Sequence, residues 1–156
     1  MAFDGKNEDY GLEEAEIKEA KQYKQFNDFV TGELYPFVKK KVVVRKFNSV
    51  AICGFGETAL SAFDISWNND EKVSMVGMFD PALGTSGDNS ILQTIEGLRK
   101  RPNLKLWIAA DMADSLSLSF KKMMDSRKSI SECTLILRNA GNDTNFAEFL
   151  LWAFPK

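Results

Sequence analysis

The sequence contains no histidine among its 156 residues. Histidine is the side chain whose ordinary pKa lets it move protons near neutral pH, and serine hydrolases with a Ser-His-acid triad need it as the general base. The chain therefore cannot contain that triad. Carboxylates and lysines remain as the groups for acid–base chemistry.

Several other features are scarce or missing. The only two cysteines, Cys53 and Cys133, sit in apolar runs, which is typical of buried free thiols. Neither a disulfide framework nor a metal cluster is indicated, and no cofactor is expected. No apolar run is long enough to span a bilayer, and residues 1–11 are polar and acidic, unlike a secretory signal. Nothing in the residues assigns a compartment.

What is present is the composition of an ordinary soluble globular protein. Apolar residues make up 44% and charged residues 27%, with a net charge of −2 and both signs interspersed. This pattern gives no electrostatic footprint for nucleic acid or for an anionic membrane, so neither partner is expected. The length favours one domain over residues 1–156, with residues 1–11 as a loose leader.

Apolar periodicity predicts alternating helices and strands. A helical pattern runs from Leu12 to about Phe37, where Pro36 should end or kink it, and the three lysines at 39–41 suit a solvated helix end. Short apolar runs then predict strands at residues 49–53, 73–79, 104–109 and 133–137, the second buried on both faces. The turn formers of residues 81–89 predict a loop, and the helix after it, around Ile91, Ile95 and Leu98, should be capped by Asp88 or Asn89. Three further segments predict helices: residues 57–68, the segment around Leu116, Phe120 and Met123, and the segment around Phe146, Phe149, Leu150 and Ala153.

This alternation predicts the α/β class. We expect a three-layer sandwich with a mostly parallel sheet of about four strands. Within it, residues 50–68 (VAICGFGETALSAFDISWN) indicate a strand, a tight glycine turn and a buried helix. That is the layout of a nucleophile elbow, in which a serine sits at the turn between strand and helix. Gly56 stands at the serine position.

The same segment carries a family likeness. The motif GFGETA followed by LSAFDISW resembles the elbow of the esterase family that includes ferric-enterobactin esterase and S-formylglutathione hydrolase, which reads approximately GFSMGG and then LSAFDIAW. Looser likenesses extend the resemblance over about residues 20–156. They lie at residues 23–38, which end in GELYPFV, and at 73–83, 103–114 and 149–154.

The resemblance implies the second half of an α/β-hydrolase fold with its catalytic positions void. Gly56 would replace the nucleophile, Asp114 (or the nearby Asp111) would be the triad acid, and Asn142 would stand at the histidine position. The family places several strands before the segment at 23–38, and this chain has no room for them. The elbow strand at 49–53 would then become a sheet edge, which invites a homodimer or a protein partner. The resemblance thus implies a degenerate, non-enzymatic binding or assembly module.

Two alternatives remain open. GFGETA also satisfies G-x-G-x-x-A, so Gly54, Gly56 and Ala59, with Asp80 at the end of the next strand, could hold NAD or FAD as a Rossmann domain does. The chain could instead be a weak hydrolase that uses paired carboxylates. The carboxylates for such a role, and for any ligand site at the strand ends, are Glu57, Asp64, Asp80, Asp111 and Asp114. Their ordinary interpretation is as caps and turn residues, with Asp64 on a helix surface.

Overall fold

The computed structural model describes residues 24–43, 45–83, 102–126, 132–138 and 141–155. The chain forms two compact units, Met1–Phe47 and Asn48–Lys156, which we describe separately. The expected leader at 1–11, the start of the first helix, the loop from residue 84 and the helix around Ile95 lie outside the described residues. Among the described residues, no helix is long and apolar enough to cross a membrane.

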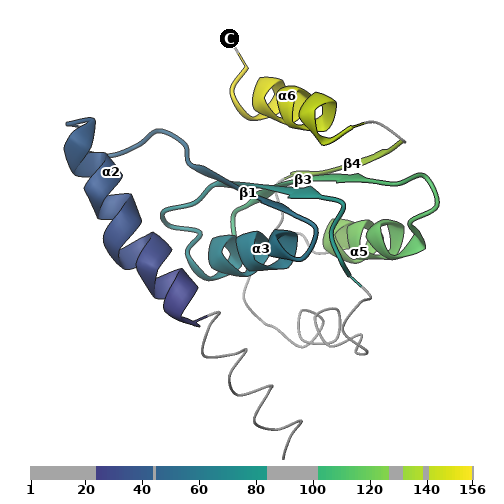
Figure 1. The fold of residues 1–156 in the computed structure, drawn as a ribbon, viewed down its shortest axis with the longest axis horizontal. Coiled ribbons are helices and arrows are strands. Elements are labelled where there is room, and N and C mark those ends of the chain that lie inside the picture. Colours follow the sequence, from purple (N-terminus) through teal and green to yellow (C-terminus); the bar gives the residue numbers. More distant parts are fainter. Residues whose placement is uncertain (1–23, 44, 84–101, 127–131, 139–140, 156) are drawn as a thin grey trace, which may run out of the picture. The chain divides into compact units, whose positions relative to one another are not determined.

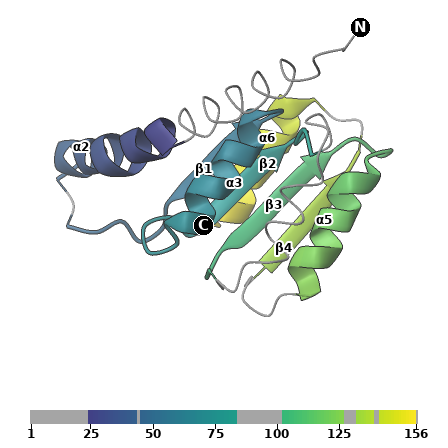
Figure 2. The same cartoon turned by 90° about the horizontal axis from the view of Figure 1, so that it is seen from below.

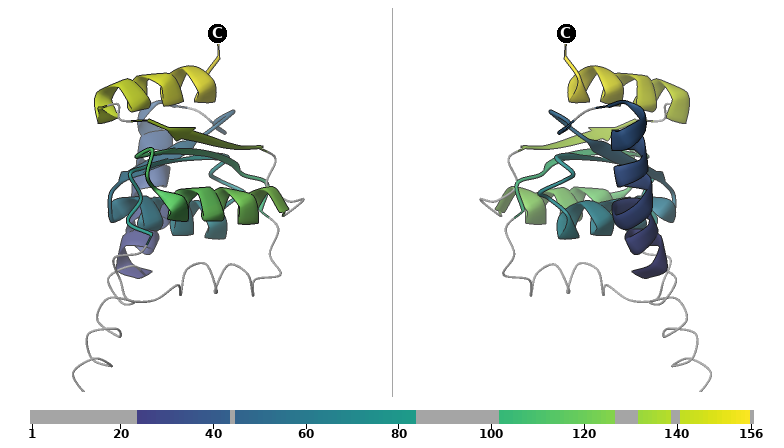
Figure 3. Two further views of the ribbon diagram at one scale, coloured as in Figure 1. Left: turned by 90° about the vertical axis from the view of Figure 1, so that its right-hand side faces the viewer. Right: turned by 90° about the vertical axis from the view of Figure 1, so that its left-hand side faces the viewer.

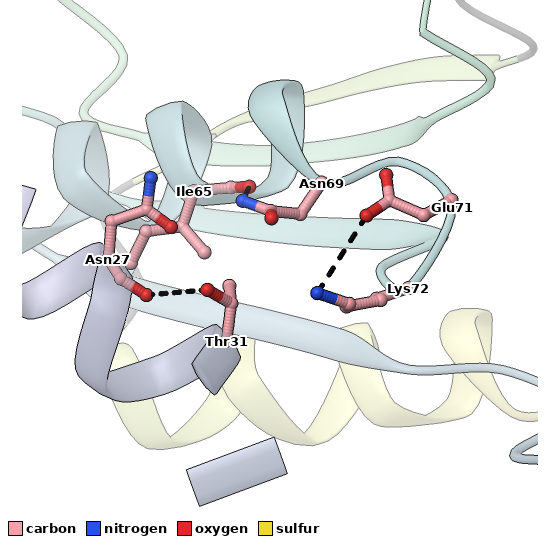
Figure 4. Close-up of polar contacts among 6 residues, drawn as sticks. All are labelled: Asn27, Thr31, Ile65, Asn69, Glu71 and Lys72. Carbon is pink, nitrogen blue, oxygen red and sulfur yellow. Dashed lines mark hydrogen bonds and ion pairs between the residues drawn. The ribbon is translucent and has the colours of Figure 1, made fainter. Parts of the chain in front are cut away.

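The first unit is helical from residue 24 and changes helix type along its length. A π-helical stretch, η1 (Phe29–Leu34), leads directly into α2 (Tyr35–Lys41). In the π-helical stretch the Thr31 hydroxyl donates a hydrogen bond of 2.9 Å to the Asn27 carbonyl (Figure 4). The last turn of α2 carries the three expected lysines.

Of the two outcomes expected for Pro36, an end to the helix near Phe37 is wrong, because the helix continues to Lys41. Pro36 lies in the first turn of α2, where a missing N–H costs little. Just before it, the Tyr35 N–H reaches the Val30 carbonyl five residues back. The wider π-type turn thus precedes the proline, and the α-helix starts afresh around it.

The second unit contains a four-stranded parallel sheet, as the sequence predicts (Figure 2). The strand order is β1-β2-β3-β4, so β1 and β4 are the two edges of the described sheet. The strands are β1 (Ala51–Phe55), β2 (Met75–Phe79), β3 (Lys105–Ala110) and β4 (Glu132–Leu137). Every residue of β2 is buried, which confirms the strand expected to be covered on both faces.

Helices cover both faces of the sheet and make three layers (Figures 1 and 3). One face carries α3 (Thr58–Asn68) and α5 (Ser115–Ser126), and the other carries α6 (Asn142–Ala153). Each strand contributes side chains to the cores on both faces, because successive side chains of a strand point to opposite faces of the sheet. The core under α3 and α5 includes Phe63, Trp67, Val76, Leu106 and Phe120. The core under α6 includes Met75, Phe79, Trp107, Phe149 and Ala153.

The end of α3 and the buried face of α6 show how these helices are held in place. The Asn69 side chain donates to the Ile65 carbonyl at the end of α3, and Lys72 pairs with Glu71 in the loop that follows (Figure 4). The residues expected to mark a C-terminal helix do lie in α6, where Phe149 and Ala153 are buried while Phe146 and Leu150 are 36% and 41% exposed. A helix against one sheet face buries only a stripe of its surface, so Phe146 and Leu150 remain outside that stripe.

Candidate functional site

The segment that carries the family likeness forms a sharp corner between β1 and α3. Gly56 lies at the corner with a φ of +58°, the left-handed region that favours glycine. Its N–H donates to the Phe79 carbonyl at 2.8 Å, and its carbonyl accepts from the Ala82 N–H at 3.3 Å. A Cβ added at Gly56 would meet nothing within 4 Å. The α-carbon of Gly56 therefore faces open space and carries only a hydrogen in place of a side chain.

Close packing of strand and helix explains the other glycine of the corner. A Cβ on Gly54 would lie 2.2 Å from the Thr58 carbonyl oxygen, so only glycine fits. The Thr58 hydroxyl accepts from the Phe55 N–H at 2.9 Å and donates to the Phe55 carbonyl at 2.8 Å. These contacts extend β1 through Phe55, two residues beyond the strand expected at 49–53. Gly54, which the sequence places at the start of the turn, is part of the strand.

Acidic residues follow the two neighbouring strands. In the sheet register Phe55 lies beside Phe79, and Phe79 beside Ala109, so Gly56, Asp80 and Asp111 all follow the carboxyl ends of adjacent strands. Asp80 is exposed, and its φ of +45° is a conformation that aspartate tolerates better than most residues. Asp111 is exposed and accepts from the Ala113 N–H at 2.8 Å, as a turn residue does.

Asp114 is bound to the first turn of α5. Its Oδ1 accepts from the N–H groups of Leu116 and Ser117 at 3.0 and 3.2 Å, and its Oδ2 accepts from the Ser117 hydroxyl at 2.5 Å. Both carboxylate oxygens are thus used in helix capping. Asp114 is therefore a helix cap, which is its ordinary interpretation, and the chain has no histidine that it could orient.

The position assigned to the catalytic histidine opens a helix. Asn142 is the first residue of α6, after the Gly141 cap. The residue that organises this region is Arg138, which the sequence analysis did not single out. Its guanidinium donates to Asn145 Oδ1 at 3.0 and 2.9 Å and lies 2.8 Å from the Glu148 carboxylate. An Asn and a Glu one turn apart on a helix are the only sequence signal for this contact.

The remaining carboxylates do not form an acid–base pair at the corner. Glu57 is the exposed N-terminal cap position of α3 and makes no side-chain cap. Asp64 lies in the middle of α3, where the Asn68 amide donates to its Oδ1 at 2.9 Å, as expected for a hydrogen-bonded surface residue. Desolvation raises the pKa of Asp64, and the hydrogen bond from Asn68 opposes that rise.

The thiols are not activated. Burial raises the pKa of Cys53 to about 11, against a backbone contact from Gly77 that lowers it. Burial also raises the pKa of Cys133 to about 12. Both are free and mostly protonated at neutral pH, so neither supplies a thiolate nucleophile. Within the described residues no three cysteine or acidic side chains gather as a metal site requires.

A cavity of about 270 Å³ lies at the other end of the sheet, where the strands begin. Its walls combine polar and apolar surface from Asn48, Ser49, Ser74, Met75, Asn103, Lys105 and Ala153. The Lys105 ammonium lies 3.2 Å from the Glu132 carboxylate, so its charge is already paired. The Trp152 indole N–H also donates to Glu132, and with Lys105 it lowers the pKa of that carboxyl. The cavity does not include the corner residues.

Comparison with protein-family models, curated proteins and solved structures finds no match. The family likeness therefore stays a prediction that depends on the residues of this chain.

Proposed function

We propose that this chain is a catalytically degenerate relative of the α/β-hydrolase esterases that works as a binding or assembly module. One observation carries the proposal. The corner between β1 and α3 has the open geometry of an elbow, yet it presents Gly56 in a chain without histidine. Acyl transfer by a Ser-His-acid triad needs a serine at this corner and a histidine base, and this chain has Gly56 at the corner and no histidine.

The layout of the sheet supports the proposed ancestry. The resemblance requires an elbow strand, then a following strand, an acid-bearing strand and a final strand. β1, β2, β3 and β4 lie side by side in that order, and Asp111 and Asp114 follow β3. The capping bonds of Asp114 are compatible with a former triad acid that now has only a structural role.

The edge strand supports the assembly half of the proposal. β1 lies at one edge of the described sheet, and its sequence AICGF has no charge and no proline. Edge strands that remain unpaired usually carry charged residues or proline, because exposed peptide groups otherwise pair with another chain. β1 lacks these protections and is suited to association.

Hydrolysis of p-nitrophenyl acetate tests the first half of the proposal. We expect the wild-type chain and Gly56→Ser to give no turnover above buffer, because a hydroxyl without a base gains little nucleophilicity. Turnover by the wild type that persists in Gly56→Ala and is lost in Asp114→Ala would overturn the proposal and favour the hydrolase based on carboxylates.

A dinucleotide-binding domain is the second candidate, and the position of Asp80 favours it. Asp80 follows the strand beside the glycine corner, where a Rossmann acid holds the ribose. The strand order opposes it, because dinucleotides bind where the order of strands reverses and the described sheet runs β1-β2-β3-β4 without reversal. Calorimetric titration with NAD and with FAD decides between them. Heat of binding at micromolar cofactor that disappears in Asp80→Ala would replace our proposal.

A further inference from the structure

The described helices of the second unit cover the two faces of the sheet unequally. One face carries α3 and α5, and the other carries α6 alone (Figures 1 and 3). A helix with its side chains is about 10 Å wide and neighbouring strands lie about 4.8 Å apart, so one helix covers about two strands. α6 packs on Met75 and Phe79 of β2 and on Trp107 of β3. It therefore leaves the side chains of β1 on this face only partly covered.

A strip of apolar side chains remains between α6 and the edge of the sheet. It consists of Ala51, Cys53 and Phe55 of β1, with Phe146 and Leu150 of α6 and Phe154 at the C-terminal cap of that helix. Ala51 and Cys53 are half-buried against the core under α6. The four larger side chains are between 36% and 47% exposed. We refer to this surface as the β1–α6 strip.

The strip runs along the whole of β1. The Phe55 and Phe146 rings lie 6.2 Å apart at the carboxyl end of the strand, and α6 ends at Ala153, which lines the cavity where the strands begin. Four residues of helix advance about 6 Å and two residues of strand about 6.6 Å. Leu150 therefore lies at the level of Cys53, one helical turn along from the two rings.

The opposite flank of α6, toward β4, is closed by polar contacts. Arg138 at the end of β4 pairs with Glu148, and Trp152 donates a hydrogen bond to Glu132 at the start of β4. The flank toward β1 carries apolar side chains at a spacing of four residues instead. Contiguous exposed apolar surface of this kind marks an interaction site.

Carboxylates surround the carboxyl end of the strip. Glu57 lies two residues after Phe55. Asp80 directly follows Phe79, on whose ring the Phe55 ring stacks at 4.7 Å. Asp143 lies in the first turn of α6, and all three acidic residues are exposed.

The cations of the described second unit lie away from this end of the strip. Lys72 and Lys105 lie at or just before the amino ends of strands, and Lys121 and Lys122 lie on α5, on the other face. Arg138 is already paired on the far flank of α6. The carboxyl end of the strip is thus negative, and a partner that covers it needs positive charge there.

We propose that the β1–α6 strip binds an amphipathic helix of a partner protein, with lysine or arginine at the end that lies over Glu57, Asp80 and Asp143. This inference rests on the binding function proposed above and names the class of partner. A helix matches the uncovered width of the sheet, and apolar side chains three and four residues apart on it would pack beside Leu150 and its neighbours.

The strip is distinct from the backbone edge of β1. The Val50 carbonyl and the Gly56 N–H both bond to β2. Because peptide groups alternate in direction along a strand, those of Ala51 and Cys53 point away from β2. An added strand would use these peptide groups, whereas a helix on the strip would use side chains.

Three labelled synthetic peptides test the proposal on the full chain by fluorescence anisotropy. The first has about 18 residues, since shorter isolated helices are marginal in water, and carries a leucine stripe with lysines in its last turn. The second replaces the lysines by glutamates, and the third has the composition of the first in scrambled order. We expect the lysine peptide to bind at micromolar concentration and the other two at least about ten times more weakly.

Substitutions on the two faces of the sheet locate the binding. Leu150→Glu should raise the dissociation constant of the lysine peptide at least about tenfold. Leu118→Glu on α5 is the matched control, because Leu118 is 38% exposed and Leu150 41%, and it should leave binding unchanged. Asp143→Lys should weaken binding of the lysine peptide and strengthen binding of the glutamate peptide.

Three results would overturn the inference: no binding of the lysine peptide below about 1 mM, equal binding of the scrambled peptide, or a dissociation constant indifferent to Leu150→Glu. A wild-type dimer that Leu150→Glu dissociates in light scattering would also overturn it, in favour of a second copy on the strip. None of these results bears on hydrolysis, which the p-nitrophenyl acetate assay tests separately.

Discussion

At the scale of single residues, the two glycines of the corner differ in what they tolerate. Gly54→Ala drives a methyl group into the Thr58 backbone, and we expect it to lower the free energy of unfolding by more than about 2 kcal/mol. Gly56→Ala meets open space and suffers only from its positive φ, at a cost of about 1 kcal/mol. Urea denaturation of both variants measures the difference. Equal losses would mean that strand and helix are not packed as closely as described.

The two thiols make stability depend on alkaline pH. Their pKa values in the folded chain, about 11 for Cys53 and about 12 for Cys133, exceed the ordinary 9.0. Above pH 9 the unfolded chain therefore loses thiol protons that the folded chain keeps, and the free energy of unfolding falls as pH rises from 9 toward 12. Below pH 9 the thiols are protonated in both the folded and the unfolded chain, so this loss of stability is absent there.

Urea denaturation across this pH range checks the thiol prediction. The double variant Cys53→Ala with Cys133→Ala serves as the reference, because lysines and tyrosines titrate in both chains. The fall in stability should be steeper in the wild type than in this variant. Parallel curves would contradict the burial of the thiols.

At the scale of elements, Arg138 holds α6 to the end of β4. Arg138→Ala removes both bonds to Asn145 and the pair with Glu148, and Asn145 is only 2% exposed. We expect a loss of about 1–3 kcal/mol in the free energy of unfolding. Glu148→Gln is the control and should cost about 0.5 kcal/mol or less, because that pair is partly exposed. Urea denaturation followed by tryptophan fluorescence measures both, and similar losses would show that the Asn145 bonds contribute little.

Periodicity in the sequence predicted the type of each described element but not every boundary or face. The apolar run of β2 is unambiguous because both faces of that strand are buried. Pro36 does not end the helix because it lies in the first turn of α2, directly after a π-helical stretch, and that arrangement depends on hydrogen-bond geometry rather than on pattern. The spacing of Phe146 and Leu150 correctly predicts a helix, but spacing cannot say how wide an apolar stripe the sheet covers, and both side chains are exposed.

The sequence predicts the corner of the candidate site, but it does not predict which side chains contact one another around that corner. Two glycines between an apolar run and a helical pattern place the turn, and Gly56 does lie there. The capping bonds of Asp114 and the contacts of Arg138 join residues through the ends of strands and helices. Their partners follow from the order of strands in the sheet, which local sequence does not encode.

At the scale of the whole molecule, the second unit is a parallel sheet covered on both faces and open at β1 within the described residues. The absence of a nucleophile at the corner and the lack of charge and proline in β1 support the two halves of the proposed function. We propose that the chain carries out no serine-type chemistry at its strand ends and that it associates through the side of β1.

Amide hydrogen exchange at Ala51 and Cys53, compared at low and high protein concentration, tests this account most directly. Pairing with a second copy protects these outward amides, so exchange should slow as concentration rises, while exchange at Val76 in the buried β2 should stay constant. Exchange at Ala51 and Cys53 that is independent of concentration would contradict assembly of this chain through the edge of its sheet.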